Sequence, residues 1–446
     1  YTSLYISFNV LRNLQCVTTF FKEREIHLNL ILFTASYPYV RGNEASFLNI
    51  EVEYLSKVFD RVLVVPETIK ESTPVNHPPV EVNTDYAEML ASKKISEISR
   101  SAFTSHILPK GIMELGFPLF SPTAWRRIIA FSGKAELTRR WVDDFLKHHH
   151  YVPKDSLFYT YWLDHAVAGI GMLREKYPEL ALISRAHGYD IYEEQYYDPP
   201  FWPCRQTVLN SMDKVYADSY AGSDYLRRRY SSFLDKFAVS LLGVRDPGFL
   251  NLPSEDNVFR IVSCSRISPE KRVDLLLEGI ASAARMRPNQ KFEWHHFGNG
   301  DQREFLQQQA DTSFPSNAKA FLPGFSDGNA LMDYYRNNPI DVFVNCSSTE
   351  GTSVAIMEAM SCGIPILATS VGGNVEIVSE KNGLLIPATV TSFEIAAGLL
   401  AFVDDPEPSA KRQGSRQKWS VEYNADVNFP EFAHDLKLIR LGKADK

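Results

Sequence analysis

One continuous stretch, residues 341–378, constrains the fold of this 446-residue chain more than any other. It begins with a strand-length apolar run and a short polar loop, after which residues 353–362 repeat apolar side chains at helical spacing. Gly363 and Pro365 end that helix, since glycine suits a left-handed cap and proline cannot continue a helix. A second apolar run, residues 364–368, follows. Strand, loop, helix and strand in this order form the unit of a parallel sheet with helices on its faces.

The start of that helix carries groups suited to a phosphate or a sugar hydroxyl. Gly351, Thr352 and Ser353 place free backbone N–H groups at a helix N-terminus, and Gly351 allows close approach to the backbone. Glu350 precedes the helix, and Glu358 lies roughly 12 Å further along its axis, at 1.5 Å per residue. Carboxylates that far apart cannot share one proton, but they can contact opposite ends of one extended ligand.

Glu358 also lies among apolar residues, where a carboxylate needs a hydroxyl or a cation as its partner. The alternative interpretation is two glutamates on an ordinary helix, one exposed and one near the positive end of the helix dipole.

Three other loops follow predicted strands. The apolar run at residues 28–35 leads into a loop that contains Gly42, the kind of loop at which doubly wound sheets bind ligands. His187 follows another strand, although a lone histidine is more often structural. Arg266 and Lys271 flank a strand-to-helix loop, where two cations can converge on an anion, and ordinary solvated charge is the alternative.

The residues 350–365, E-G-T-S-V-A-I-M-E-A-M-S-C-G-I-P, resemble the nucleotide-sugar signature of retaining glycosyltransferases of family 4, which have the GT-B fold. The resemblance implies an α/β protein with two Rossmann-like parallel-sheet domains that face each other across a cleft. It also implies that Glu350 faces the donor sugar and that Glu358 holds the nucleotide ribose hydroxyls. Similar motifs extend the resemblance from about Ile26 to the end of the chain.

Those motifs suggest roles for the other loops. H-G-Y-D at 187–190 resembles the donor-sugar motif, in which His187 touches the transferred sugar and Asp190 orients it or a neighbouring loop. S-R-I-S-P-E-K at 265–271 resembles the diphosphate clamp, with serine where glycine is usual, and the Gly42 loop has one glycine where many members have a pair. The predicted catalytic residues are His187, Arg266, Lys271 and Glu350. The predicted donor-binding residues are Gly42, Asp190, Phe321, Leu322, Gly351, Thr352, Ser353, Val354 and Glu358, with Phe321 and Leu322 reading the base through their backbone.

The chain is long enough for two domains with separate cores. We predict an N-terminal appendage at 1–25, an N-terminal acceptor domain at 26–245, a linker at 246–257 rich in proline and polar residues, and a donor-nucleotide domain at 258–418. By resemblance, residues 419–446 form a helix that crosses back to the first domain.

The reaction that this resemblance implies is sugar transfer from a nucleotide diphosphate sugar to a hydroxyl of a glycan or lipid-linked glycan, with retained configuration, in surface polysaccharide synthesis. The leaving phosphate would accept the proton of the acceptor, and Arg266 and Lys271 would stabilise its charge. We expect no cofactor and no metal, because the sequence has no suitable D-x-D loop or metal-binding histidine spacing. A nucleotide-sugar epimerase and a non-catalytic sugar-nucleotide-binding protein are the alternatives.

Residues 93–140 interleave basic and apolar side chains. They hold nine basic and three acidic residues, a net charge of +6 in a chain whose net charge is −7. Such a segment predicts contact with an anionic membrane or a lipid-pyrophosphate acceptor. Helices that merely cover the first sheet are the alternative.

Composition also bears on the compartment and the partners. A net negative charge argues against a nucleic-acid partner. The five cysteines have no C-x-x-C spacing, which favours buried thiols in a reducing compartment, and no run of 18 apolar residues predicts a membrane span. We therefore expect a cytoplasmic protein with peripheral contact at the inner face of the membrane.

Overall fold

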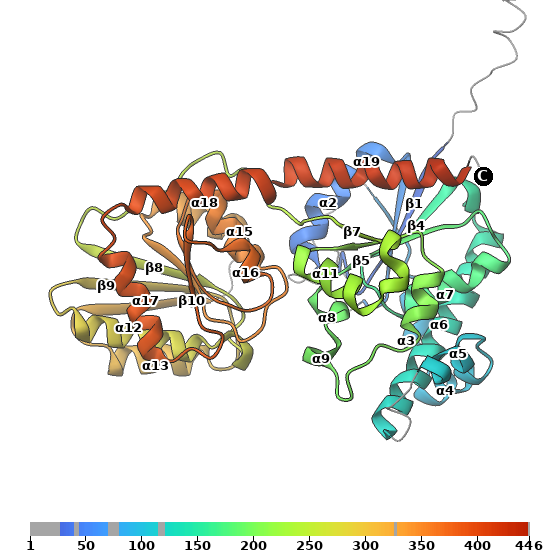
Figure 1. Ribbon diagram of the computed structural model, residues 1–446, viewed down its shortest axis with the longest axis horizontal. Helices are drawn as coiled ribbons and strands as arrows, with labels where there is room; N and C mark the ends of the chain where they lie inside the picture. Colours follow the sequence, from blue (N-terminus) through green and yellow to red (C-terminus); the bar gives the residue numbers. More distant parts are fainter. Residues whose placement is uncertain (1–26, 40–43, 70–79, 115–120, 325–327, 445–446) are drawn as a thin grey trace, which may run out of the picture.

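The computed structural model describes residues 27–39, 44–69, 80–114, 121–324 and 328–444, which form two α/β domains (Figure 1). The predicted appendage at 1–25 lies outside the described residues, as does Gly42. Both sheets are parallel, and helices cover their faces, as predicted for two Rossmann-like domains.

Within the described residues the first sheet has seven strands in the order β3-β2-β1-β4-β5-β6-β7. These strands are β1 (Asn29–Thr34), β2 (Arg61–Pro66), β3 (Glu81–Val82), β4 (Ser156–Thr160), β5 (Ala181–Ala186), β6 (Lys214–Ala217) and β7 (Phe237–Val239). The second sheet has six described strands in the order β10-β9-β8-β11-β12-β13. They are β8 (Val258–Cys264), β9 (Lys291–Phe297), β10 (Ala318–Gly324), β11 (Val342–Asn345), β12 (Ile366–Thr369) and β13 (Gly383–Ile386).

The longer helices of the first domain are α2 (Ala45–Val58), α3 (Asp85–Ala91), α4 (Ile95–Phe103), α5 (Ile107–Glu114), α6 (Pro122–His148), α7 (His165–Gly171), α10 (Arg205–Asn210) and α11 (Tyr220–Arg229). Two short helices, α8 (Gly188–Ile191) and α9 (Glu193–Tyr196), follow β5. The second domain has α12 (Val273–Met286), α13 (Arg303–Ser313), α14 (Gly328–Asn337), α15 (Val354–Ser361), α16 (Asn374–Ile377) and α17 (Ser392–Val403). The chain ends with α18 (Pro408–Glu422) and α19 (Ala425–Ala444).

Each face of the first sheet has its own hydrophobic cluster, because successive side chains of a strand point to opposite faces. In β1, Ile31 and Phe33 join a cluster that includes residues of α6 and α7. Leu30 and Leu32 join the other cluster, which includes residues of α2 and α19. Burial on both faces explains why this strand is a continuous apolar run rather than an alternating one.

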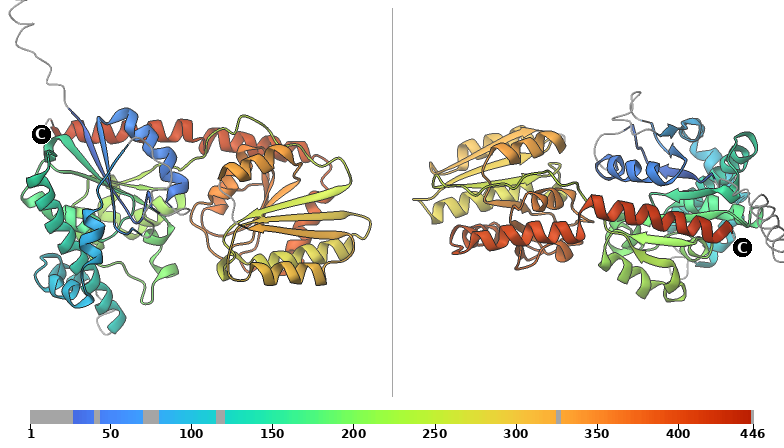
Figure 2. Two further views of the ribbon diagram at one scale, coloured as in Figure 1. Left: turned by 180° about the vertical axis from the view of Figure 1, so that it is seen from behind. Right: turned by 90° about the horizontal axis from the view of Figure 1, so that it is seen from above.

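The C-terminal helix belongs to the first domain in space. From the end of α18 the chain enters α19, which lies along the first domain beside α2 (Figures 1 and 2). Phe432 packs against Tyr159 and Tyr216 of the first sheet, with ring centroids 5.7 and 5.0 Å apart. The helix that lies against the first domain begins at Ala425, whereas position 419, where the sequence analysis placed the start of the crossing segment, lies within α18.

The two chain crossings between the domains lie side by side. Val244, which precedes the predicted linker, forms an isolated parallel bridge with Asn424, just before α19. A Cβ on Gly243 would lie 2.6 Å from the backbone nitrogen of Ala425, so only glycine permits this close approach. The two crossings therefore form one connection.

Candidate active site

Glu350 and Lys271 meet at the carboxyl edge of the second sheet. Glu350 follows β11 and Lys271 follows β8, and these strands are neighbours. The Glu350 Oε1 accepts hydrogen bonds from Lys271 Nζ at 2.7 Å, Asn345 Nδ2 at 2.9 Å and Ser347 Oγ at 2.6 Å. Lys271 thus balances the charge of a carboxylate whose side chain is only 9% exposed.

Arg272 holds these two loops together, although the sequence analysis did not single it out. Its guanidinium donates to the backbone carbonyls of Cys346 at 2.7 Å and Ser347 at 2.6 Å. Its backbone is left-handed, with a φ of 49°, a conformation that is uncommon for a residue other than glycine. Such local strain is often found at functional sites.

Arg266, by contrast, does not join Lys271 in this structure. Its side chain is 74% exposed, and its nearest described carboxylate is Glu270, at 3.8 Å. Of the two predicted cations, Lys271 therefore lies at the Glu350 cluster and Arg266 lies outside it.

Glu358 lies in different surroundings from Glu350. It is on α15, which begins after Ser353, and no described residue donates a hydrogen bond to its carboxylate. Burial raises the pKa of Glu358 from its ordinary value to about 7. A side chain added at Gly328, the first residue of α14, would lie 3.7 Å from the Glu358 Oε1. Among the described residues, the Glu358 carboxylate thus has no hydrogen-bond donor, which would leave it able to accept from ligand hydroxyls.

A second glycine-rich loop encloses Gly351. Gly373 donates from its backbone nitrogen to the Gly351 carbonyl at 2.9 Å. Gly372 has a φ of +47°, and a Cβ there would lie 1.8 Å from the Glu350 carbonyl oxygen. Only glycine fits this contact, so the loops that precede α15 and α16 pack directly on each other.

His187 is held at the carboxyl edge of the first sheet, directly after β5. Its ring lies 4.7 Å from the ring of Tyr161 and 4.9 Å from that of Trp162. Its Nδ1 lies 3.1 Å from the Asp218 Oδ2, whereas its buried Nε2 has no hydrogen-bond partner among the described residues. Burial alone would lower the pKa of His187, but the hydrogen bond to Asp218 and the charges of Asp218 and Asp190 raise it above its ordinary value.

Asp190 orients the backbone around His187. Its Oδ1 accepts from the His187 backbone nitrogen at 2.6 Å, and its Oδ2 accepts from that of Leu163, also at 2.6 Å. Burial raises the pKa of Asp190 to about 6. The carboxylate therefore ties the loop after β5 to the loop after β4.

The two halves of the site touch each other. A Cβ on Gly351 would lie 3.8 Å from the Gly188 backbone nitrogen, and Thr352 Oγ1 donates to the Asp218 carbonyl at 3.4 Å. Glu376 of α16 accepts from the backbone nitrogens of Tyr220, at 2.9 Å, and Ala221. Glu376 of the second domain thereby caps the N-terminus of α11 in the first.

The predicted base-reading residues lie further along the second sheet. Phe321 is 43% exposed and stacks on His295, with ring centroids 4.7 Å apart. Both backbone groups of Leu322 are engaged by α13, since its nitrogen donates to Gln307 and its carbonyl accepts from Arg303, each at 3.1 Å. A base that bonds to the Leu322 backbone would have to displace these side chains.

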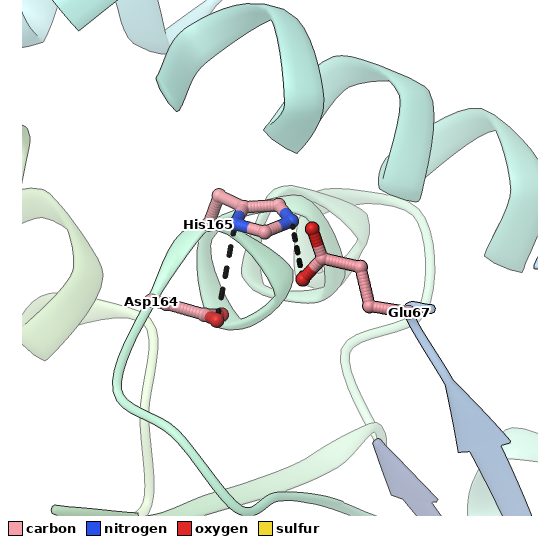
Figure 3. Close-up of side chains that lie close together, drawn as sticks. All are labelled: Glu67, Asp164 and His165. Carbon is pink, nitrogen blue, oxygen red and sulfur yellow. Dashed lines mark ion pairs between the residues drawn. The ribbon is translucent and has the colours of Figure 1, made fainter. Parts of the chain in front are cut away.

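One group of described residues could hold a metal ion by proximity: Glu67, Asp164 and His165 have ligand atoms within 4.8 Å of one another (Figure 3). His165 Nε2 lies 3.5 Å from the Glu67 Oε2, and its Nδ1 lies 3.8 Å from the Asp164 Oδ2. The ring thus presents different nitrogens to the two carboxylates, and the Lys134 ammonium already lies 2.6 Å from Glu67. These contacts favour an ion-pair cluster that joins β2, α6 and α7.

Sequence reasoning missed Asp218, Glu376 and Glu44. Asp218 directly follows β6, next to the strand that leads to His187, which was the available signal. Glu44 is buried and organises the loop after β1, because its carboxylate accepts from the backbone nitrogens of residues 35–37.

The second domain, which carries Lys271, Glu350 and Glu358, is similar in sequence to known glycosyltransferases. Residues 248–419 match the family described as "Glycosyl transferases group 1". The chain is 28% identical over 135 residues to a UDP-N-acetylglucosamine–peptide N-acetylglucosaminyltransferase GtfA subunit of Streptococcus agalactiae, covering 30% of this chain and 25% of the relative. It is 28% identical over 222 residues to WcaL of Escherichia coli K12, named for colanic acid biosynthesis, covering 46% and 52%. The chain thus spans a quarter to about half of these relatives.

Solved structures resemble nearly the whole chain. HepE of Anabaena, solved with UDP and glucose, has a TM-score of 0.60 at 17% identity and covers 92% of this chain and 100% of its own. Sucrose-phosphate synthase of Thermosynechococcus elongatus has a TM-score of 0.64 at 15% identity, covering 93% and 100%. At these identities the likeness shows the fold. Residues 248–419 therefore have the sequence pattern of glycosyl transferases group 1, and the two described domains together have the GT-B fold.

Proposed function

We propose that this protein is a retaining glycosyltransferase of family 4 that transfers a sugar from a nucleotide diphosphate sugar to a hydroxyl of a glycan or lipid-linked glycan, in surface polysaccharide synthesis. The observation that carries the proposal is the pairing of Lys271 with Glu350 at the sheet edge that meets the His187 loop. Relatives named for sugar transfer from UDP-N-acetylglucosamine and for colanic acid biosynthesis support it.

Each predicted site residue has a separate role in the proposed reaction. Glu358 would accept hydrogen bonds from the ribose hydroxyls, and Lys271, joined by Arg266, would stabilise the charge that grows on the leaving diphosphate. Glu350 and His187 would contact the sugar from opposite domains. In this proposal the cations replace a metal ion, and the leaving phosphate accepts the proton of the acceptor.

Nucleotide binding and product formation test the proposal in turn. UDP, GDP and ADP are compared by thermal shift, since a ligand at 100 times its dissociation constant adds about 2.7 kcal/mol of stability. UDP-glucose and UDP-N-acetylglucosamine are then incubated with glycan acceptors, and the products and their anomeric configuration are determined. Conversion of the donor sugar without an acceptor would identify an epimerase, and binding without any product would identify a binding protein.

Glu350→Gln is expected to reduce sugar transfer without weakening nucleoside diphosphate binding. The substitution removes a charged acceptor that would face the sugar, which costs about 1.5–3 kcal/mol, or roughly 10- to 150-fold in rate. It also frees Lys271 from its ion pair, so the affinity for UDP should stay equal or rise. Titration calorimetry with UDP and initial transfer rates measure the two effects. Glu380→Gln, at an exposed position, is the control, and a large loss of UDP affinity in Glu350→Gln would contradict the role.

Peripheral contact with the inner face of an anionic membrane is the other part of the proposal. Five of the nine basic residues at 93–140 have partners within the protein: Lys93, Arg127, Lys134, Arg139 and Arg140. Four exposed ones have no ion-pair partner among the described residues: Lys94, Arg100, Lys110 and Arg126. Ile95, Phe103 and Met113 on α4 and α5 are 84%, 73% and 84% exposed. No helix within the described residues is long and apolar enough to span a membrane.

Flotation with vesicles should therefore recover the protein with anionic lipid at low salt and lose it at high salt. At about 1 kcal/mol for each cation, the four exposed residues supply up to roughly 4 kcal/mol. Arg100→Glu with Lys110→Glu should reduce the recovery, and Lys291→Glu in the second domain should not. Equal recovery with neutral and anionic vesicles would contradict an electrostatic contact.

A further inference from the structure

We propose that Asp218 is a positioning residue for His187, whose imidazole it fixes so that Nε2 is the ring nitrogen presented to the donor sugar. The inference rests on the proposed function in one respect, the nature of the ligand that meets Nε2. The hold of Asp218 on the ring itself is a property of the protein alone.

The sheet register brings the two residues together. β5 and β6 are parallel neighbours in which Ala186 is paired with Ala217, so His187 and Asp218 both leave the sheet at its carboxyl edge. The Asp218 backbone nitrogen also donates to the Ala186 carbonyl at 3.2 Å. Both side chains are buried, and His187 Nδ1 lies 3.1 Å from the Asp218 Oδ2.

This contact defines which ring nitrogen carries a proton. An ionised carboxylate only accepts hydrogen bonds, so His187 Nδ1 must be the donor. Nε2 then faces the ligand as an acceptor in the neutral ring and as a donor in the charged ring. Because Nε2 is buried and has no hydrogen-bond partner among the described residues, a ligand hydroxyl would satisfy it.

The second domain holds Asp218 from the other side. Thr352 Oγ1, next to Gly351, donates to the Asp218 carbonyl, and Glu376 caps the helix that begins two residues after Asp218. The residue that orients His187 is thus bonded to the loop that would carry the sugar diphosphate. Contact between the two domains and orientation of the imidazole thus involve the same short segment, residues 218–221.

The first test measures the imidazole directly. Three charged groups influence the His187 pKa: Asp218 and Asp190 raise it, and Arg185 lowers it. Removal of the Asp218 charge should therefore lower this pKa. The protein is labelled with ¹⁵N-histidine, the His187 signal is assigned with His187→Asn, and its titration and tautomer are compared in wild type, Asp218→Asn and Asp218→Glu. A lower pKa in Asp218→Asn, restored by Asp218→Glu, is expected, and an unchanged titration and tautomer would overturn the proposal.

The second test is a double-mutant cycle on turnover of UDP-glucose or UDP-N-acetylglucosamine. Asp218→Asn should lower kcat by about 10- to 100-fold, the range found when a partner that orients a metal-ligating histidine is removed, with UDP affinity unchanged. In a His187→Ala background Asp218→Asn should have no further effect, because it acts through the imidazole. Equal losses in both backgrounds would overturn the proposal.

Asp213→Asn provides the matched control. Asp213 precedes β6 at the opposite end of the same strand, where it bonds to Arg174 and to the Leu182 backbone. Its substitution should affect stability equally in both backgrounds and leave the His187 titration unchanged. Absence of donor turnover in the wild type would contradict the proposed function, whereas the titration would still decide whether Asp218 holds His187.

Discussion

Lys271→Ala should lower the rate of sugar transfer at saturating donor by about 10²–10³-fold, a larger effect than the loss of stability that follows from leaving Glu350 without its cation. Loss of one preorganised group that stabilises developing charge costs about 2.7–4 kcal/mol of barrier. Lys271 is 19% exposed and bonded to Glu350, so its ammonium is already fixed where a leaving diphosphate would lie against the α15 loop. The measurements are kcat with UDP-glucose or UDP-N-acetylglucosamine and the thermal unfolding midpoint.

Two variants make this result specific. Lys319→Ala removes an exposed ammonium from edge strand β10 of the same sheet and should leave kcat unchanged. Arg266→Ala should cost less than Lys271→Ala, because the Arg266 side chain is 74% exposed and outside the Glu350 cluster. If Lys271→Ala retained the wild-type kcat, Lys271 would be a structural partner of Glu350 and nothing more.

The second large effect concerns Glu358, because burial of its ionised carboxylate lowers the stability of the ligand-free protein. The pKa of Glu358 is raised from 4.5 to about 7. The free energy of unfolding is therefore unaffected by this group below about pH 4.5, where it is protonated in both states, and it decreases as the pH rises to about 7. At 1.36 kcal/mol per unit, the loss above pH 7 is about 3 kcal/mol. Glu358→Gln should abolish this part of the pH dependence. Urea unfolding of both proteins from pH 4.5 to 8 measures it, and parallel curves would contradict the assignment.

Glu358→Gln should also weaken the binding of UDP. A hydrogen bond to a charged group contributes about 1.5–3 kcal/mol, so Glu358→Gln should raise the dissociation constant roughly 10- to 150-fold. Ribose hydroxyls that donate to Glu358 favour its ionised form, so the wild-type affinity should rise about tenfold between pH 6 and 8. Glu358→Gln should not show this rise in affinity with pH. Because titration of the UDP diphosphate affects both proteins equally, the difference between their pH profiles reports Glu358 alone. Calorimetry at several pH values tests both statements.

The fold was largely predictable because several of its strands, such as β1, β2 and β11, are nearly continuous apolar runs bounded by loops. Residues 28–35 contain β1, whose six residues are all buried, and the predicted helix at 353–362 contains α15. The segment 93–140 gave no such pattern, because it forms helices α4 to α6. In α6 the buried Glu136 pairs with Arg139 and Arg140, so a charged residue lies on an inward face and obscures the periodicity.

The candidate site was predictable only where its residues lie in recognisable loops. Lys271 and Glu350 each lie in a loop that follows an apolar strand, so both could be singled out from the sequence, but their contact depends on β8 and β11 being neighbours in the sheet. Asp218 was missed because an aspartate before a helix resembles an ordinary cap, and its contact with His187 depends on the register of β5 and β6. Glu376 was missed because its partners are backbone groups of the other domain, which leave no trace in residue type.

The position of α19 has a consequence for synthesis of the protein on the ribosome. Phe432, Ala433 and Leu436 complete one hydrophobic cluster of the first sheet, yet the last strand of that sheet ends at Val239. Translation proceeds at about 5–20 residues per second, so the missing helix arrives roughly 10–40 s after the sheet. During that interval Tyr159 and Tyr216 lack the helix that covers them in the finished chain. The N-terminal domain is therefore synthesised first, but its hydrophobic cluster is complete only when the end of the chain has been translated. A nascent chain stalled within the second domain should be a substrate for chaperones that bind exposed apolar surface.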